Sequence, residues 1–340
     1  MTMRTIHYFL KPLRVLGATV VIGWSSSVAL AQQPNYQLLG DGLVAFQVRP
    51  NFYVLTGAGA NIALQVGTDG AVVVDAGDAE HADRVVAAIK KLTDAPIRFL
   101  INTGDDPDHV GGNAKVAGSG KTIFAGEDPF GVGKAMGVSR GAVIAAAEPV
   151  LLRMSASGTY PSGSVPTDPF AQRRWYIYLN GEGIEAMRQE NAHTDGDSIV
   201  FFRRSDVVMA GDIIDMRRFP VIDLDRGGSI RGEIAALNRL VDLAIPSVPI
   251  VSRDAGTVVV PGHGRLLDLT DVVEYRDMVT IVRDRIQALM KQGKSLKEIK
   301  AAKPTQGFTS RYGSDTGPWT TDMFVEAVFK SLAADAPRRR

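Results

Sequence analysis

The stretch that decides the fold is Asn102-Thr103-Gly104-Asp105-Asp106-Pro107-Asp108-His109-Val110-Gly111-Gly112-Asn113. It follows the apolar run 97–101, which is typical of a buried strand, so its short side chains project from one strand-end loop. Asp106, Asp108 and His109 are potential ligands of a divalent metal, because carboxylates and imidazoles suit hard or borderline cations. Asp105 is interpreted as a solvated turn residue. Taken alone, this acidic turn is also typical of a solvated loop.

Three segments further along the chain carry matching side chains. His193 opens the segment 193–201, Asp212 ends the apolar segment 207–212, and His263 follows the strand candidate 257–260. Each of these residues alone is more typical of a turn or of a hydrogen-bonded polar side chain. Together, and in this order, they indicate a shared metal site.

Composition narrows the possible functions. The 340-residue chain has no cysteine, which excludes thiolate metal sites and cysteine nucleophiles. Its formal net charge is +1 at pH 7, so no broad attraction to nucleic acid is expected. No glycine-rich nucleotide-binding pattern follows a strand. A small-molecule substrate is therefore the expected partner, and the oligomeric state stays open.

The first residues have the pattern of a targeting segment. Arg4, Lys11 and Arg14 precede a short apolar stretch at 15–24, and Ala29-Leu30-Ala31 fits the small-x-small cleavage rule. The pattern predicts a signal peptide at 1–31, cleaved near Ala31, and export to a periplasm or secretion. The apolar stretch is short for a membrane span, so an uncleaved anchor is the weaker interpretation and no stable membrane association is expected after cleavage.

The first half of the chain alternates between short apolar runs and turn residues, which predicts strands. The predicted strands are 43–48, 52–55, 61–66, 71–75, 96–101 and 121–125. Helical spacing of apolar residues predicts helices at 79–92 and 113–118. The alanine-rich residues 131–155 predict a long helix, and residues 160–170, rich in Pro, Ser and Gly, predict an irregular loop.

Strands resume after this loop, and helices dominate the end of the chain. The predicted strands are 174–179, 183–188, 198–203, 206–209 and 257–260, and the predicted helices are 229–244, 271–291 and 318–334. Met323, Val325 and Phe329 are core candidates in the last helix, and Ser295 with Glu298 forms a capping box. This order of elements predicts two β-layers with helices outside.

The ordered motifs resemble the metallo-β-lactamase superfamily of metal-dependent hydrolases over about residues 44–263. The resemblance implies an α/β fold, a four-layer αββα sandwich, followed by C-terminal helices like those of exported members. It implies a metallo-β-lactamase-like domain at 32–265 and a helical extension at 266–340 packed on the same domain. Asp75, which matches the family's strand-end aspartate, is expected to brace the central loop.

The resemblance also implies which residues hold metal. The ligands of one complete position would be Asp108, His109, Asp212 and His263. The other position departs from the family's His-x-His-x-Asp-His motif, because Gly104 and Asp106 stand where two histidines are expected. Only His193 and the shared Asp212 remain there, and Asp106 can offer a carboxylate in place of a lost imidazole. A site that loses two imidazoles should bind weakly, so a single ion is expected.

The implied activity is hydrolysis, in which a metal-bound hydroxide attacks the carbonyl of an ester, lactone, thioester or β-lactam. The expected catalytic residues are Asp108, His193 and Asp106, with His193 or Asp106 as general base or substrate contact. The expected cofactor is one zinc ion, with manganese or iron as alternatives. Arg217 and Arg218 can meet an anionic substrate group, and Phe219-Pro220 can line an apolar wall.

Two other interpretations stay open. A non-catalytic binding or sensor protein would keep the fold and the pocket with a decayed metal site, because buried carboxylates without a cation repel one another. An oxidoreductase of the family would normally need two irons and a flavin partner, and no flavin domain is indicated. The metal content of the protein, with and without Asp212→Ala, separates these interpretations.

Overall fold

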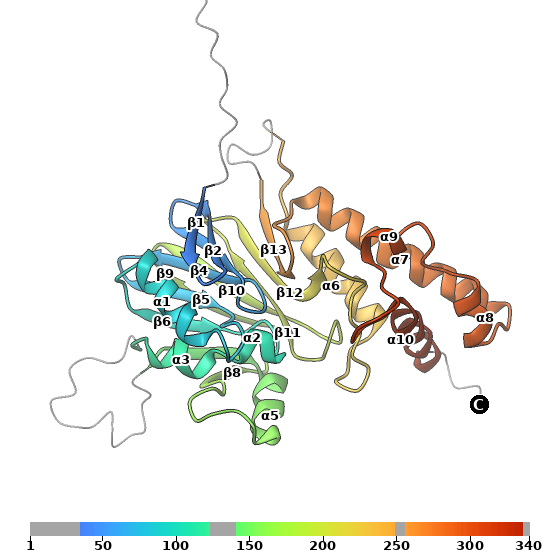
Figure 1. Ribbon diagram of the computed structural model, residues 1–340, viewed down its shortest axis with the longest axis horizontal. Coiled ribbons are helices and arrows are strands. Elements are labelled where there is room, and N and C mark those ends of the chain that lie inside the picture. Colours follow the sequence, from blue (N-terminus) through green and yellow to red (C-terminus); the bar gives the residue numbers. More distant parts are fainter. Residues whose placement is uncertain (1–34, 123–140, 249–255, 336–340) are drawn as a thin grey trace, which may run out of the picture. The chain divides into compact units, whose positions relative to one another are not determined.

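The computed structural model describes residues 35–122, 141–248 and 256–335 (Figure 1). The predicted signal peptide and most of the predicted strand at 121–125 lie outside these residues, and the described Lys121 and Thr122 are not in a strand. Within the described residues, none of the helices is both long enough and apolar enough to span a membrane.

In the described part of the chain, eight strands form the larger sheet, in sequential order. They are β1 (Tyr36–Gly40), β2 (Leu43–Arg49), β3 (Phe52–Thr56), β4 (Ile62–Gly67), β5 (Gly70–Val74), β6 (Ile97–Ile101), β7 (Val143–Ala147) and β8 (Asp168–Phe170). The pairs from β1 to β5 are antiparallel, and those from β5 to β8 are parallel. The parallel strands end at the same edge of the sheet, and this edge carries the 102–113 loop.

A smaller sheet of five described strands has the order β13-β12-β11-β10-β9. The strands are β9 (Arg174–Leu179), β10 (Glu182–Gln189), β11 (Asp197–Phe202), β12 (Val207–Asp215) and β13 (Val258–His263). Only β12 and β13 pair in parallel among these strands. Asp212 lies in β12 and His263 ends the parallel β13, so the sheet brings these distant residues close together.

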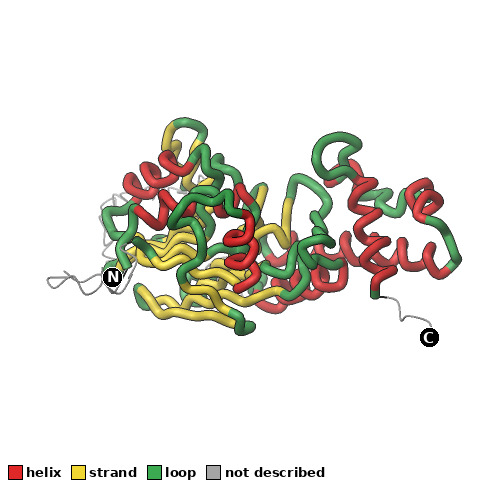
Figure 2. The backbone as a smooth tube through the Cα atoms, turned by 90° about the horizontal axis from the view of Figure 1, so that it is seen from below, coloured by secondary structure: helices red, strands yellow, loops and turns green. Residues whose placement is uncertain are grey.

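Three apolar cores separate four layers, which confirms the predicted αββα sandwich (Figure 2). The two sheets pack on each other, for example where the rings of Phe52 and Phe202 meet edge to face at 4.8 Å. Helices α1 (Ala82–Leu92) and α3 (Asn113–Gly118) cover the larger sheet. Helices α6 (Ile230–Leu243) and α7 (Leu269–Lys291) cover the smaller one.

The C-terminal helices share a core with α6 and the smaller sheet. After α7 come α8 (Leu296–Ala301), α9 (Thr309–Tyr312) and α10 (Thr321–Ala334). Phe219, which follows β12, stacks on Phe324 of α10 with ring centroids 4.9 Å apart. The capping box of Ser295 and Glu298 is present at α8. Val325 is buried as predicted, but Met323 is 42% exposed, because it lies on the solvent side of α10.

Two elements differ from their prediction. Of the helix predicted at 131–155, residues 131–140 lie outside the described part, residues 143–147 form strand β7, and the helix α5 spans Glu148–Ser157. Ala145, Ala146 and Ala147 are fully buried between the parallel strands β6 and β8, where tertiary packing overrides the helix propensity of alanine. Residues 168–170 of the predicted loop form β8, which extends the same parallel edge.

Candidate metal centre

The candidate site lies where strands of both sheets end. The short helix α2 (Pro107–Val110) follows β6 and carries Asp108 and His109, and Asp106 precedes it. His193 lies in the loop between β10 and β11, where the Thr194 backbone N–H and hydroxyl donate to Asp197 at 2.8 and 3.0 Å. The structure thus brings all six sequence-predicted ligands together in two adjoining groups.

The first group contains the ligands predicted for the complete position. Ligand atoms of Asp108, His109 and His263 lie within 4.8 Å of one another. Oδ1 of Asp212 is 3.1 Å from Nε2 of His109 and 3.5 Å from Nε2 of His263. Oδ2 of Asp108 is 3.1 Å from Nε2 of His263. Two imidazoles and two carboxylates therefore converge on one point, a donor set that suits zinc, manganese or iron.

Asp75 fixes the orientation of His109. Its Oδ2 accepts a hydrogen bond from Nδ1 of His109 at 2.8 Å, and its carboxylate also accepts from the Thr103 N–H at 2.8 Å and hydroxyl at 2.6 Å. Asp75 is fully buried, so these bonds are not exchanged with water. Asp75 therefore braces the central loop, as expected, and turns Nε2 of His109 toward Asp212.

The geometry around His109 fits a divalent ion. Nε2 of His109 and Oδ1 of Asp212 are both buried and have no hydrogen-bond partner among the described residues, although they lie 3.1 Å apart. Burial lowers the pKa of His109, but the carboxylates of Asp212 and Asp75 raise it further, to well above its usual value. The two carboxylates thus favour a positive charge at Nε2 of His109, which either a proton or a metal ion can supply.

Gly262 makes room for this arrangement. A Cβ atom at this position would collide with Oδ1 of Asp212 and with the backbone of Gly211. The Pro261-Gly262-His263 sequence therefore places a histidine beside Asp212 only because the preceding residue has no side chain. A Cβ at Gly104 would have open space, with Oδ1 of Asp197 as its nearest neighbour at 3.8 Å.

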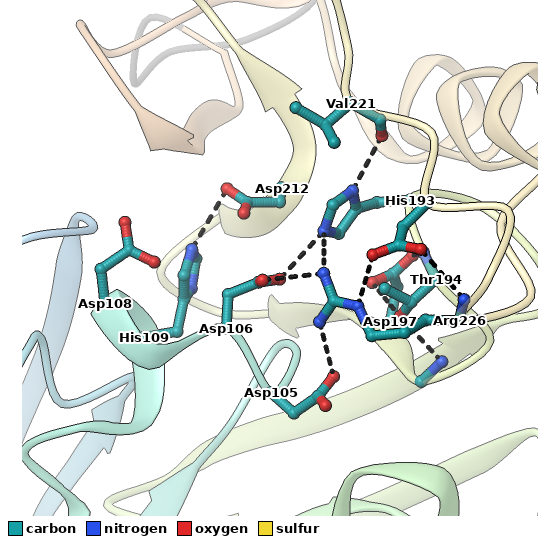
Figure 3. A network of polar contacts seen from close by, with 12 residues as sticks. Asp105, Asp106, Asp108, His109, His193, Thr194, Asp197, Asp212, Val221 and Arg226 are labelled. Atoms are coloured by element: carbon teal, nitrogen blue, oxygen red, sulfur yellow. Dashed lines mark hydrogen bonds and ion pairs between the residues drawn. The ribbon is translucent and has the colours of Figure 1, made fainter. Parts of the chain in front are cut away.

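The second group is built differently, because Arg226 enters it (Figure 3). Ligand atoms of Asp106, His193 and Asp212 lie within 4.8 Å of one another. Oδ2 of Asp106 accepts from Nε2 of His193 at 2.9 Å, and Oδ1 accepts from Nη2 of Arg226 at 2.9 Å. Nδ1 of His193 donates to the Val221 carbonyl at 2.8 Å. Both oxygens of Asp106 and both ring nitrogens of His193 therefore have partners, and Arg226 adds a positive charge beside the group.

Electrostatics at the second group follow from these contacts. Burial lowers the pKa of His193, but its hydrogen bond to Asp106 and the nearby Asp197 and Asp212 raise it to about 10. Burial raises the pKa of Asp106, and His193 and Arg226 lower it to about 2. At neutral pH the pair is therefore an imidazolium beside a carboxylate, and His193 in this state holds a proton rather than accepting one.

Asp105 is not the solvated turn residue that the sequence suggests. It is 7% exposed, and its two oxygens accept from Nε and Nη2 of Arg153 at 2.7 Å each. Arg153, on α5, also pairs with Asp195 of the His193 loop. This guanidinium ties the two loops of the site together. The sequence offered no spacing that would link Arg153 or Arg226 to the site.

Other sequence-predicted contacts have mixed outcomes. Arg217 and Arg218 both pair with Asp215, through bonds of 2.9 and 2.7 Å, and Arg217 remains half exposed. Asp212 and Asp108 contribute to the raised pKa of Arg217, which places this guanidinium within electrostatic reach of the first group. Phe219 does not line a pocket wall, because it is 1% exposed and stacked in the core of the C-terminal helices.

Comparison with known proteins agrees with this geometry. Residues 55–263, more than half of the chain, match the metallo-beta-lactamase superfamily. The chain belongs to this superfamily. The matched region contains every candidate ligand from Asp106 to His263 and ends at that last histidine. No curated protein matches the sequence.

Solved structures show the same superfamily fold at low sequence identity. The metallo-beta-lactamase from Pontibacter korlensis has a TM-score of 0.50 and 16% identity, over 70% of this chain and 99% of that one. The sec-alkylsulfatase Pisa1 from Pseudomonas sp. has a TM-score of 0.58 and 15% identity, over 87% of this chain and 52% of that one. This superfamily member thus spans about half the length of the alkylsulfatase.

Proposed function

We propose that this metallo-β-lactamase superfamily member is a metal-dependent hydrolase with one divalent ion held by Asp108, His109, Asp212 and His263. The observation that carries the proposal is the buried contact of His109 Nε2 and Asp212 Oδ1, two atoms that lie 3.1 Å apart and have no hydrogen-bond partner among the described residues. Zinc is the expected ion, and manganese and iron suit the same donors.

When bound, such an ion would polarise a carbonyl oxygen and activate water at neutral pH. Asp75 keeps His109 in the orientation that this requires, since it holds Nδ1 at 2.8 Å. Asp108, whose side chain is 41% exposed, lies at the open side of the group, where it can contact substrate or water.

We assign the second group to proton transfer. In the metal-free site His193 carries a proton at neutral pH, with Nε2 on Asp106 and Nδ1 on the Val221 carbonyl. An imidazolium beside the ion suits a proton donor to the leaving group, whereas the sequence suggested a general base or a substrate contact. Asp106 keeps this proton in place, because its second oxygen is fixed by Arg226.

The substrate class follows from the superfamily and the charges at the site. Esters, lactones, thioesters and β-lactams share the carbonyl that this chemistry attacks. Arg217 is half exposed, held by Asp215 and near Asp108 and Asp212, so an anionic group on the substrate would meet it. Because a sec-alkylsulfatase is among the proteins with this fold, an alkyl sulfate belongs in the same screen.

Export is part of the proposal, supported by the charged, apolar and small-x-small pattern of residues 1–31. The partner is a small molecule rather than nucleic acid, in keeping with the net charge of +1.

Hydrolysis of this substrate panel by zinc-loaded protein tests the proposal. We expect turnover of one carbonyl class, a fall of at least about 10²-fold in kcat/KM for Asp212→Asn, and no change for Asp225→Asn, an exposed aspartate on the nearby 221–228 loop. Turnover that survives chelation and Asp212→Asn would contradict the proposal. Tight metal binding without turnover of any substrate would favour the binding or sensor protein.

A further inference from the structure

A guanidinium lies beside the position that a second metal ion would take in this superfamily fold. Asp106, His193 and Asp212 converge there, and Gly104 adds no side chain. Nη2 of Arg226 lies 2.9 Å from Oδ1 of Asp106 and 3.4 Å from Nε2 of His193. Figure 3 shows the Arg226 side chain reaching between Asp106 and Asp105 from the far side of the site.

Arg226 is built into this place rather than resting on the surface. Its Nε donates to Asp223 at 2.7 Å, and its Nη1 lies 3.5 Å from Asp105. Its side chain is 26% exposed. Three carboxylates thus surround one guanidinium. Burial lowers the pKa of Arg226, but these carboxylates raise it above its usual value.

The loop that carries Arg226 is tied to the loop of His193. The Asp223 N–H donates to the His193 carbonyl at 3.0 Å, and the Asp195 N–H donates to the Arg226 carbonyl at 3.0 Å. At Gly228 a Cβ atom would collide with the His193 carbonyl, so the two backbones touch. The guanidinium and the imidazole therefore keep one mutual geometry.

We propose that Arg226 is the resident cation of the second group, Asp106, His193 and Asp212, in place of a second ion. This inference rests on the proposed function, because it takes one ion to be bound in the complete group. Both oxygens of Asp106 already accept hydrogen bonds, from His193 and from Arg226, so a metal ion there would have to displace or share these contacts. A divalent ion there would also lie against a fixed positive charge. Arg226 is a positioning residue, which holds the Asp106 carboxylate and the His193 ring beside the remaining ion.

Metal counting on variants tests this assignment. Manganese is titrated into the full-length protein, with bound ions counted by mass spectrometry and spin coupling followed by electron paramagnetic resonance. Wild type is expected to hold one ion with the spectrum of an isolated centre. Arg226→Met is expected to take up a second ion at higher manganese concentration, whereas Arg153→Met, which removes a neighbouring guanidinium that does not touch Asp106, should still hold one.

Arg226→Met alone can bind the second ion too weakly for the ion to be detected. A second set of variants, in which the two missing histidines are restored, covers that case. Gly104→His with Asp106→His restores two imidazoles, and a Cβ atom at position 104 would meet no atom closer than Oδ1 of Asp197 at 3.8 Å. We expect this pair to bind a second ion at least 10-fold more tightly when Arg226→Met is added, with a spin-coupled spectrum. The assignment would be overturned if removal of Arg226 changed the binding of a second ion neither in the wild-type sequence nor in the two-histidine variant. Two ions bound to the wild type would also overturn it.

The proposed function and the Arg226 assignment fail in different ways. Absence of any ion from the complete group of the wild type would defeat the proposed function. The assignment is tested by the number of ions gained when Arg226 is removed, so it can stand or fall separately. Circular dichroism of each variant confirms that the fold is retained.

Discussion

Asp75 Oδ2 accepts a hydrogen bond from Nδ1 of His109 at 2.8 Å, and both side chains are buried. The backbone of Asp75 is in the left-handed region, with φ of +60°, which asparagine tolerates well. The substitution Asp75→Asn therefore removes the charge behind His109 with little change in shape.

We expect Asp75→Asn to weaken metal binding about 10–100-fold, because the partner that orients a ligating histidine also raises its basicity. Competition with a chromophoric chelator measures the affinity. Asp78→Asn is the matched control, since Asp78 holds Nδ1 of His81 at 2.8 Å in the same way but outside the site. Equal affinity in Asp75→Asn and wild type would show that this contact does not support the ion.

The ion pair of His193 and Asp106 makes a pH-dependent contribution to stability in the metal-free protein. The pKa of His193 is raised to about 10 in the folded protein, above its ordinary value of 6.5. The stabilising effect is therefore fully present below about pH 6.5 and is lost as the pH rises through 10.

Nitrogen chemical shifts of the His193 ring, assigned with His193→Gln, follow this titration in chelated protein. We expect both ring nitrogens to stay protonated at pH 8. Loss of one proton near pH 6.5 would mean that Asp106 does not hold the imidazolium, and the proton-donor role would have to be withdrawn.

Glu233 of α6 is fully buried, and neither carboxylate oxygen has a partner among the described residues. Burial, with Asp197, raises its pKa well above the usual value, so the native state favours the protonated form. A raised folded pKa means that the folded state loses stability relative to the unfolded state as the pH rises above about 4.5.

Glu233→Met should therefore be more stable than wild type at pH 8, by roughly 1–4 kcal/mol, and this advantage should shrink toward pH 4. Urea unfolding at both pH values, with the metal content held constant, measures the difference. If Glu233→Met is more stable than wild type by the same amount at both pH values, the gain in stability comes from packing and not from the ionisation of Glu233.

Arg153 links the central loop to the His193 loop through Asp105 and Asp195. Arg153→Met should lower the free energy of unfolding by about 1–3 kcal/mol, less than for a fully buried pair because the guanidinium is partly solvated. Denaturant unfolding measures the change. Arg283→Met, at a more exposed pair with its neighbour Asp284, should cost no more than about 0.5 kcal/mol. Similar costs for the two variants would contradict the bridging role.

Much of the fold could be predicted from local patterns. Strand β4 and helix α6 follow from periodicity and turn residues, and Ser229 caps α6 by accepting from the Gly232 N–H at 2.9 Å. Strand β7 could not be predicted, because its alanines favour a helix by themselves and become a strand only through burial between β6 and β8.

The candidate ligands were found because the sequence predicts each at or near the end of a strand and each carries a metal-binding side chain. The two arginines of the site, Arg153 and Arg226, were not predicted. Arginine is frequent in solvated loops, and nothing in the local sequence relates Arg226 to Asp106, 120 residues away. Asp105 was interpreted as solvated for the same reason, because its partner Arg153 lies on a separate helix. Long-range ion pairs of this kind depend on the tertiary fold.

Metal stoichiometry of the purified protein, prepared without chelator and measured by plasma mass spectrometry, tests the central claim most directly. The account predicts one divalent ion per chain, lost in Asp212→Ala and in His263→Ala and retained in Asp225→Ala. A chain that holds no ion after incubation with zinc, manganese or iron, or one whose ion survives both substitutions, would contradict it.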